Sequence, residues 1–283
     1  MKQNQFVSSE TAWCPGCGNF SILETLIDVL NELNTPPHQI VLVGGIGQAA
    51  KANQYVSANG FSGLHGRALP AAVAIKIAND ALTVIVNTGD GDSYGEGGNH
   101  FLHNIRRNVD ITHFVHDNQI YGLTKGQPSP TSDACNLGHK TTSCNMSVPF
   151  NPLVVAIAAG ATFVARSFTG HKEHLAKIMA AAILHKGYAL VDILQPCVSF
   201  NKTNTFAYYK QRVQELDASY DPANKMAALE KSMEFGDTIP IGILYQEQAP
   251  TYEDKRPQLF DGIPLIDKPH NMESVKALIN SYI

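Results

Sequence analysis

Positive charge and long apolar runs are scarce in this chain of 283 residues. Its 21 lysines and arginines are outnumbered by 25 acidic residues and form no basic run, which argues against a nucleic-acid-binding protein. No apolar stretch reaches the roughly 18 residues needed to span a bilayer. Residues 1–13 lack the apolar segment of a signal peptide. We therefore expect a cytoplasmic protein that binds neither nucleic acid nor a membrane.

Cysteine is also scarce, with five residues, and the number is odd. Without a secretory signal, an odd number argues against a disulfide framework and favours catalytic, metal or cluster roles. Cys14 and Cys17 form a C-x-x-C pair, whereas Cys197 stands alone after an apolar run. Cys135 and Cys144 lie in a polar segment, where we interpret them as ordinary loop thiols.

The apolar residues follow the pattern of an α/β protein. Residues 39–47 (QIVLVGGIG) and 81–92 (ALTVIVNTGDGD) are apolar runs that end in glycine, and a third run ends at Asn118. Buried strands that alternate with helices predict an α/β fold with a parallel sheet and helices on both faces. The predicted helices cover residues 21–33, 69–79, 97–108, 151–159 and 171–185, and the further strands cover 110–118, 161–165 and 188–194.

The alternating pattern ends near residue 198, and we place a domain boundary there. Residues 1–198 are predicted to form one α/β domain that begins with the C-x-x-C segment. Residues 199–283 are polar and interrupted by proline, and we interpret them as an irregular C-terminal extension that packs on the core or on a partner subunit.

The acidic, glycine-rich segment 87–99 (NTGDGDSYGEGGN) directly follows a predicted buried strand. Ligands of parallel sheets bind beyond the carboxyl ends of strands, where glycines and the next helix offer main-chain N–H groups to a phosphate. Asp90 cannot bind a phosphate, because both are anionic, but it can hold Mg²⁺ that bridges to a pyrophosphate. Asn118 and the carbonyl of Ile120 can add oxygens. This spacing favours a metal–pyrophosphate site over a turn with solvated aspartates.

Seven motifs carry a resemblance to a known family. They are WCPGCGN (13–19), GGIGQAAK (44–51), GLHGR (63–67), GDGDSYGEGGNHFLHNIRRN (89–108), NQIYGLTKGQPSPTS (118–132), ILQPC (193–197) and FGDTIPIGILYQ (235–246). In this order they resemble the β subunit of 2-oxoacid:ferredoxin oxidoreductases. The G-D-G motif followed by asparagine resembles the pyrophosphate-binding motif of thiamine diphosphate enzymes. The resemblance therefore implies a thiamine diphosphate-binding fold of the pyrophosphate type.

The resemblance also implies roles for individual residues. Mg²⁺ would bind Asp90, Asn118 and the carbonyl of Ile120. His65 would lie near the diphosphate or the reaction centre. Lys51 and Lys125 are next to the cofactor loops and could meet the carboxylate of a 2-oxoacid, so these three are the candidate catalytic residues. The remaining candidates for the cofactor-binding surface are Ile46, Gly47, Gln48, Gly89, Gly91, Asp92, Leu123 and Thr124, with His65.

Cys14, Cys17 and Cys197 match three of the four thiolates that hold a [4Fe–4S] cluster in the family. The fourth position is Gln48 here, and an amide is a poor ligand for iron. Three interpretations stay open: a cluster with a non-thiolate or exogenous fourth ligand, a cluster completed by a loop cysteine, or no cluster, with residual thiols or zinc. We favour the [4Fe–4S] cluster. A C-x-x-C redox dithiol would leave Cys197 without a role.

The resemblance implies coenzyme A-dependent oxidative decarboxylation of a 2-oxoacid by thiamine diphosphate, with electrons passed through the cluster to ferredoxin. Pyruvate, 2-oxoglutarate and branched-chain oxoacids are open as substrates, as is the reverse reaction. The pyrimidine end of the cofactor needs a second α/β domain, for which the about 85 residues after 198 are too few. We therefore expect an α subunit as partner, in a heterodimer or (αβ)₂, and no activity without it.

Two other functions are possible from the sequence. A non-redox thiamine diphosphate-dependent 2-oxoacid decarboxylase subunit would lack the cluster, which Gln48 favours and the three matching cysteines oppose. A binding module that only covers a partner would not need three phosphate-facing loops at one sheet edge.

Overall fold

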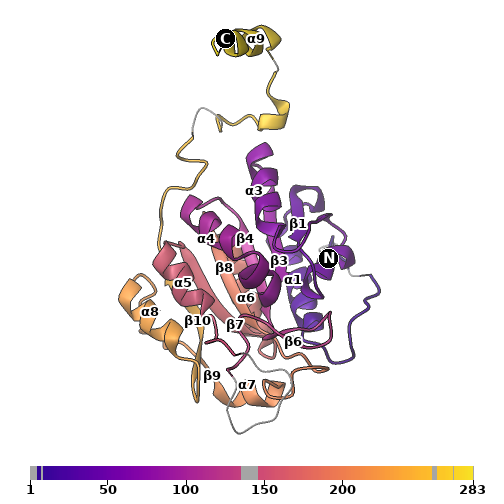
Figure 1. The fold of residues 1–283 in the computed structure, drawn as a ribbon, viewed down its shortest axis with the longest axis vertical. Helices are drawn as coiled ribbons and strands as arrows, with labels where there is room; N and C mark the ends of the chain where they lie inside the picture. Colours follow the sequence, from indigo (N-terminus) through magenta and orange to yellow (C-terminus); the bar gives the residue numbers. More distant parts are fainter. Residues whose placement is uncertain (1–4, 8, 135–145, 257–259, 270, 283) are drawn as a thin grey trace.

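The computed structural model is built around an eight-stranded sheet with the strand order β2–β1–β3–β4–β8–β7–β10–β9 (Figure 1). It describes residues 5–7, 9–134, 146–256, 260–269 and 271–282. Strands β2 to β7 in this order are all parallel, whereas β10 is antiparallel to β7 and pairs in parallel with β9. The strands are β1 (Ile40–Gly44), β2 (Asn59–Ser62), β3 (Thr83–Gly89), β4 (Thr112–Asp117), β7 (Phe163–Phe168), β8 (Ala189–Leu194), β9 (Val213–Glu215) and β10 (Ile239–Gln246).

Helices cover both faces of this sheet, so the predicted fold class is confirmed. One face is buried by α1 (Asn19–Leu33), α2 (Ala52–Tyr55) and α6 (Lys172–Leu184). The other is buried by α3 (Ala68–Ala78), α4 (Gly98–Arg107), α5 (Pro152–Ala159) and α8 (Lys225–Met233). Local signals set the helix ends: at α5, the Asn151 side chain accepts the Val154 N–H, and Gly160 ends the helix in the left-handed region.

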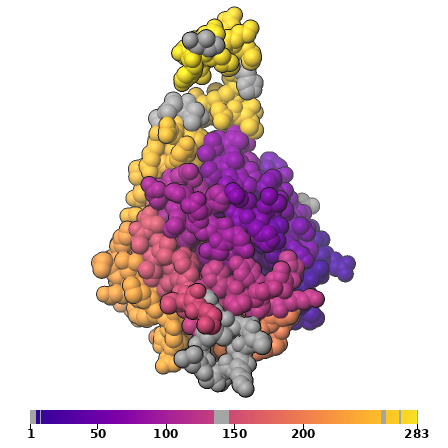
Figure 2. Space-filling model, in the orientation of Figure 1, coloured from indigo at the N-terminus to yellow at the C-terminus, as the bar shows by residue number. Residues whose placement is uncertain are grey.

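The C-terminal segment is more regular than its composition predicts. It contains α7 (Phe206–Arg212), and its strand β10 is buried in the sheet beside β7. After β10 the chain continues through the short turn η4 (Leu265–Asp267) to α9 (Met272–Asn280), which stands away from the sheet beyond the end of α3 (Figures 1 and 2). The domain boundary near residue 198 stays a prediction, and the sheet extends past it.

The loops that follow the parallel strands contain most of the short elements. They hold η2 (Ala49–Lys51), the π-helical turn η3 (Gly91–Glu96) and a small hairpin of β5 (Ile120–Tyr121) and β6 (Gln127–Pro128); η1 (Pro37–Gln39) precedes β1. Because η3 separates Asp90 from α4, the helix expected to supply N–H groups begins eight residues after Asp90. Among the helices of the described residues, none has both the length and the apolar character that a membrane crossing requires.

Candidate functional site

Asp90 and Asn118 lie beyond the ends of neighbouring parallel strands, β3 and β4. The register pairs Gly89 with His116, so Asp90 is level with Asp117, and Asn118 follows one position later. Asp90 is 1% exposed, and Asn118 is half-buried, with its Oδ1 accepting the Ile120 N–H at 3.0 Å. The structure therefore brings the predicted metal ligands to one edge of the sheet.

Asp90 belongs to a buried acidic cluster that the sequence motifs did not reveal. The Thr131 hydroxyl lies 2.7 Å from Asp90 Oδ2 and 2.9 Å from Asp117 Oδ1, and its single proton can be donated to one of them at a time. Asp192 is 3% exposed and accepts the Tyr94 hydroxyl at 2.8 Å. Burial raises the pKa of Asp90 and, with the nearby Asp192 and Asp90 charges, raises that of Asp117.

One buried cation faces this cluster in the described part of the chain. Arg166 is 2% exposed and donates to the carbonyls of Ser232, Glu234 and Pro240. It partly offsets the burial that raises the pKa of Asp192 to about 6. One guanidinium offsets only part of the charge that these three carboxyl groups carry when ionised, and a divalent cation at Asp90 would stabilise the ionised form.

The glycines around Asp90 have two different functions in the structure. A Cβ on Gly89 or on Gly47 would meet no atom within 4 Å, so both glycines face open space at the strand ends. A Cβ on Gly91 would lie 2.3 Å from the Tyr121 ring, so Gly91 permits close packing of the loop after β3 against the hairpin. Open space beside a buried carboxylate fits the binding of a metal-bridged diphosphate.

Asp92 holds the loops of the site together. Its Oδ1 accepts the Gly66 N–H at 2.8 Å and the Ile46 N–H at 3.3 Å, and His65 Nδ1 lies 3.7 Å from the same oxygen. Burial raises the pKa of Asp92, and these two main-chain donors oppose the rise. The Ile46 N–H is thus already used within the protein. Contact of Asp92 and Ile46 with a diphosphate stays a prediction. Such a contact must use atoms other than the Ile46 N–H and Asp92 Oδ1, which are hydrogen-bonded to each other.

We predict that Gly66→Ala destabilises the β1, β2 and β3 loops together. Gly66 has a φ of 65°, and a Cβ there would lie 2.4 Å from the carbonyl carbon of Glu96. The loops must separate, which we expect to lower the free energy of unfolding by about 2–4 kcal/mol. Urea unfolding measures the change. The matched control is Gly160→Ala, which has a φ of 93° but meets no atom within 4 Å, and an equal loss there would contradict the packing argument.

The other predicted site residues occupy more open positions. His65 is 59% exposed, Lys51 ends η2, and Lys125 is exposed with a φ of 77°. Leu123 is 43% exposed, and the Thr124 hydroxyl donates to Gln127 Oε1 at 2.6 Å. These residues lie on the loops that follow the strands. Their predicted roles in catalysis and cofactor binding stay predictions.

The cysteine pair and Cys197 approach each other from loops that are far apart in the sequence. Burial raises the pKa of the Cys17 thiol, helped by the nearby sulfurs of Cys197 and Cys14. All three cysteines are free thiols. A Cβ on Gly122 would lie 3.6 Å from Cys197 Sγ and 3.9 Å from Asn118 Nδ2, so Cys197 lies beside the Asn118 loop.

Gln48 contacts the residue that precedes the cysteine pair, because the Trp13 indole N–H donates to the Gln48 carbonyl at 2.9 Å. Its Oε1 is buried with no hydrogen-bond partner in the described part of the chain. There, too, no group of three or more His, Cys, Asp or Glu side chains is placed to hold a metal ion. Cys135 and Cys144 lie outside the described residues.

Two residues with central positions were missed from the sequence. Thr131 joins the carboxylates of Asp90 and Asp117, and Gln119 donates from Nε2 to the Thr131 carbonyl at 3.0 Å. Gln119 has a φ of 57°, an uncommon conformation that its buried hydrogen bonds hold in place. Both stand inside the motif 118–132, but only the fold shows what they contact.

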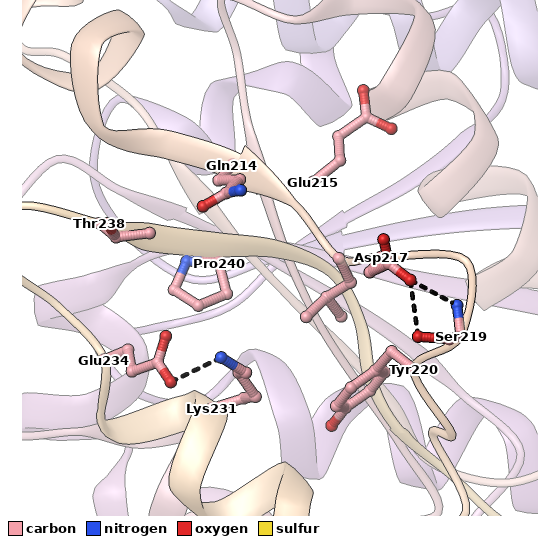
Figure 3. Close-up of a pocket in the computed structure, with 10 residues that line it drawn as sticks. Gln214, Glu215, Asp217, Ser219, Tyr220, Lys231, Glu234, Thr238 and Pro240 are labelled. Carbon is pink, nitrogen blue, oxygen red and sulfur yellow. Dashed lines mark hydrogen bonds and ion pairs between the residues drawn. The ribbon is translucent and has the colours of Figure 1, made fainter.

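Two hollows differ in how they relate to this site. One has a volume of about 290 Å³ between β9, β10 and α8, where Lys231 pairs with Glu234 at 2.7 Å (Figure 3). It contains none of the predicted site residues. The second, of about 240 Å³, reaches Asp117, Arg166 and Asp192. It therefore approaches the acidic cluster.

Two family models match this chain in succession. "Thiamine pyrophosphate enzyme, C-terminal TPP binding domain" matches residues 43–193, and the model for the C-terminal part of the pyruvate ferredoxin oxidoreductase beta subunit matches residues 197–261. A 2-oxoacid:ferredoxin oxidoreductase subunit beta from Saccharolobus solfataricus is 47% identical over 276 residues, covering 90% of each chain. This chain belongs to the family of 2-oxoacid:ferredoxin oxidoreductase β subunits. The resemblance stated from the motifs is confirmed.

Other members show the same similarity over most of this β subunit. The 2-oxoacid:ferredoxin oxidoreductase 1, subunit beta, of Aeropyrum pernix is 44% identical, covering 87% of this chain and 81% of its own. A solved 2-oxoglutarate:ferredoxin oxidoreductase from Magnetococcus marinus, with 2-oxoglutarate, coenzyme A and succinyl-CoA bound, has a TM-score of 0.87 at 34% identity. The match covers 96% of this chain and 94% of that one, so the family fold extends through nearly the whole β subunit.

Proposed function

We propose that this β subunit binds Mg²⁺–thiamine diphosphate and, with an α subunit, oxidatively decarboxylates a 2-oxoacid with coenzyme A, passing electrons to ferredoxin. The main support is the pairing of buried Asp90 with Asn118 at adjacent strand ends, in a chain of this family. The relative from Magnetococcus marinus that binds 2-oxoglutarate and coenzyme A supports the substrate class.

In this proposal the residues at the strand ends bind and orient the cofactor. Asp90, Asn118 and the Ile120 carbonyl would hold Mg²⁺, and the open faces of Gly47 and Gly89 would admit the diphosphate. When bound, thiamine diphosphate supplies the carbanion-stabilising chemistry that decarboxylation of a 2-oxoacid requires.

Side chains around the mouth of the site would act on the substrate and on the loops. His65 is exposed, with its Nδ1 3.7 Å from Asp92 Oδ1, and Asp92 fixes the His65 loop through the Gly66 N–H. Lys51 and Lys125 would bind the substrate carboxylates by charge. A second lysine suits a dicarboxylic oxoacid, so we include 2-oxoglutarate among the substrates.

The cysteines support an iron–sulfur cluster on this subunit. Cys14, Cys17 and Cys197 offer soft thiolate ligands from two loops, beside the loop that carries Asn118. Gln48 stands at the sequence position of the family's fourth thiolate, and its Oε1 is buried with no hydrogen-bond partner among the described residues, so a fourth ligand would be this amide or an exogenous group. Gln48 also supports the alternative function, a 2-oxoacid decarboxylase subunit that has no cluster. Iron and sulfide analysis of anaerobically purified complex separates the two functions.

We predict that the β subunit alone is inactive and that the α subunit restores activity. The family model for thiamine pyrophosphate binding covers only residues 43–193, and the other end of the cofactor needs a second α/β domain. Oxoacid- and coenzyme A-dependent reduction of ferredoxin should therefore be at background for β alone and appear in the co-expressed complex. Turnover by β alone would contradict the need for a partner. A complex that releases CO₂ without reducing ferredoxin would support the decarboxylase.

A further inference from the structure

Basic side chains gather on the outer side of α4, which lies between α3 and α5 in one helix layer (Figure 1). The helix carries them at spacings of three and four residues, so they share one face: His100, His103, Arg106 and Arg107. Arg67, the residue before α3, joins them, because its Nη1 lies 3.1 Å from His100 Nε2. All of them are exposed except His100, which is partly buried. We call these five residues the α4 basic patch.

The arginines of the patch have no acidic partner in the part of the chain that the structure describes. Arg67, Arg106 and Arg107 form no ion pair there. The Nη1 of Arg106 instead lies 3.4 Å from His103 Nδ1. Burial lowers the pKa of His100, and the charges of Arg67 and Arg107 lower it further. The patch is therefore positive, although the whole chain has a formal net charge of −4.

The stability of α4 itself accounts for only one end of the patch. Arg106 and Arg107 lie in the last turn, where positive charge is stabilised by the negative end of the helix dipole. His100 lies in the first turn and holds the Arg67 guanidinium there, at the positive end of the dipole. A cation at that end is unfavourable for the helix, and an anionic partner would offset this cost.

The same end of the patch lies beside the loops of the candidate site. Gly66, directly before Arg67, donates its N–H to Asp92, and α4 follows η3, the turn that comes directly after Asp90. The patch therefore starts at the strand-end loops and continues along α4. In the proposed function, a domain of the α subunit must reach the same loops to bind the other end of the cofactor. A subunit seated there would have its surface next to the α4 basic patch.

We propose that the α4 basic patch is a docking surface for an acidic face of the α subunit. This inference rests on the proposed function, which supplies the partner and its position. Exposed charges at the edge of an interface mainly raise the rate of association and fix the orientation of the partners, whereas they add little to affinity. The patch thus orients the α subunit over the site as the complex forms.

The test reverses one charge of the patch in the variant Arg107→Glu and measures association of the purified α and β subunits by stopped-flow fluorescence. We expect the association rate to fall about tenfold at an ionic strength of about 0.03 M, and the difference to shrink at about 0.5 M, where exposed charges are screened. The matched control is Lys177→Glu, the same change at an exposed cation of α6, on the other face of the sheet. This control should associate at the wild-type rate.

Each outcome bears on the inference in a different way. Equal association rates for Arg107→Glu and wild type overturn it and leave the proposed function standing. An equal loss in Lys177→Glu assigns the effect to net charge and also overturns it. Normal association with a raised KM for coenzyme A would assign the patch to the phosphates of that substrate, which overturns the inference as well. A wild-type complex that associates through the patch but turns over no 2-oxoacid contradicts the proposed function and not the docking.

A second measurement covers the case in which Arg107→Glu unfolds α4. The variant Arg107→Lys keeps the charge and adds an amine, which a carbodiimide couples to a carboxylate in contact with it. In the αβ complex we expect a cross-link from position 107 to an aspartate or glutamate of the α subunit, identified by mass spectrometry of the peptides. Lys177 serves as the internal control and should form none. A complex without the cross-link from position 107 overturns the inference.

Discussion

Asp90→Asn is expected to abolish Mg²⁺-dependent binding of thiamine diphosphate while leaving the subunit folded. Asparagine keeps the size of the side chain and the oxygen that accepts from Thr131. It removes the charge that would hold the cation at a buried site. Loss of one partner of a buried ionic contact costs about 3–5 kcal/mol, so we expect affinity and ferredoxin reduction to fall at least roughly 100-fold. Titration calorimetry on the αβ complex measures the affinity.

The fold of the variant should be retained, because burial raises the pKa of Asp90 in the cation-free chain. Removing this carboxylate relieves a desolvation cost, so the unfolding temperature without Mg²⁺ should stay the same or rise. The matched control is Asp217→Asn, the same change at an exposed carboxylate in the hollow of Figure 3, which should bind the cofactor normally. Full affinity in Asp90→Asn would remove the metal site on which the proposed function depends.

The central sheet was predictable from the sequence because its strands are buried on both faces. Such strands are continuous apolar runs, and they alternate with helices whose apolar spacing is equally clear. The strand predicted over 110–118 is β4 (Thr112–Asp117), and the helix predicted over 171–185 is α6 (Lys172–Leu184). The same pattern located the candidate site, because residues after adjacent parallel strands must meet at one edge.

The C-terminal strands were missed for a local reason. In β10, Pro240 and Gly242 interrupt the apolar run, and both residues are typical of turns. The strand accommodates Pro240 and Gly242 through contacts with neighbouring residues. The Pro240 carbonyl accepts from Arg166, and Gly242 has a φ of 141° beside Leu216. These are tertiary contacts, which a pattern of apolar residues does not record.

Contacts that link distant loops also limited the prediction of the site. Thr131 reaches Asp90 across 41 residues, and Gln195 reaches Cys17 across 178. Neither threonine nor glutamine has a sequence signature for such a contact. The motifs were enough to name candidate ligands of the cation and candidate thiols, whereas the residues that control their charge required the fold.

Burial of Asp192 in the acidic cluster makes the stability of the folded subunit depend on pH. The variant Asp192→Asn tests this dependence. Burial raises the pKa of Asp192 from 3.8 to about 6 in the folded chain. Between these values the folded chain binds more protons than the unfolded chain, so stability falls as pH rises. Above pH 6 the folded chain bears the full cost of burying the ionised Asp192 carboxylate, about 3 kcal/mol, and below pH 3.8 this cost disappears. In the cation-free subunit, Asp192→Asn should therefore be stabilising at pH 7 and neutral near pH 4.

His116 lies at the same sheet edge and should make stability change with pH in the opposite direction, which His116→Gln tests. Burial lowers the pKa of His116 from 6.5 to about 3, so below pH 6.5 the unfolded chain binds a proton that the folded chain does not. The histidine therefore destabilises the fold increasingly as pH falls, and glutamine should stabilise it at pH 5 relative to pH 7. Urea unfolding at pH 7, 5 and 4 measures how the free energy of unfolding changes with pH for wild type and for each variant. Parallel pH profiles would show that neither group has the shifted pKa that its burial predicts.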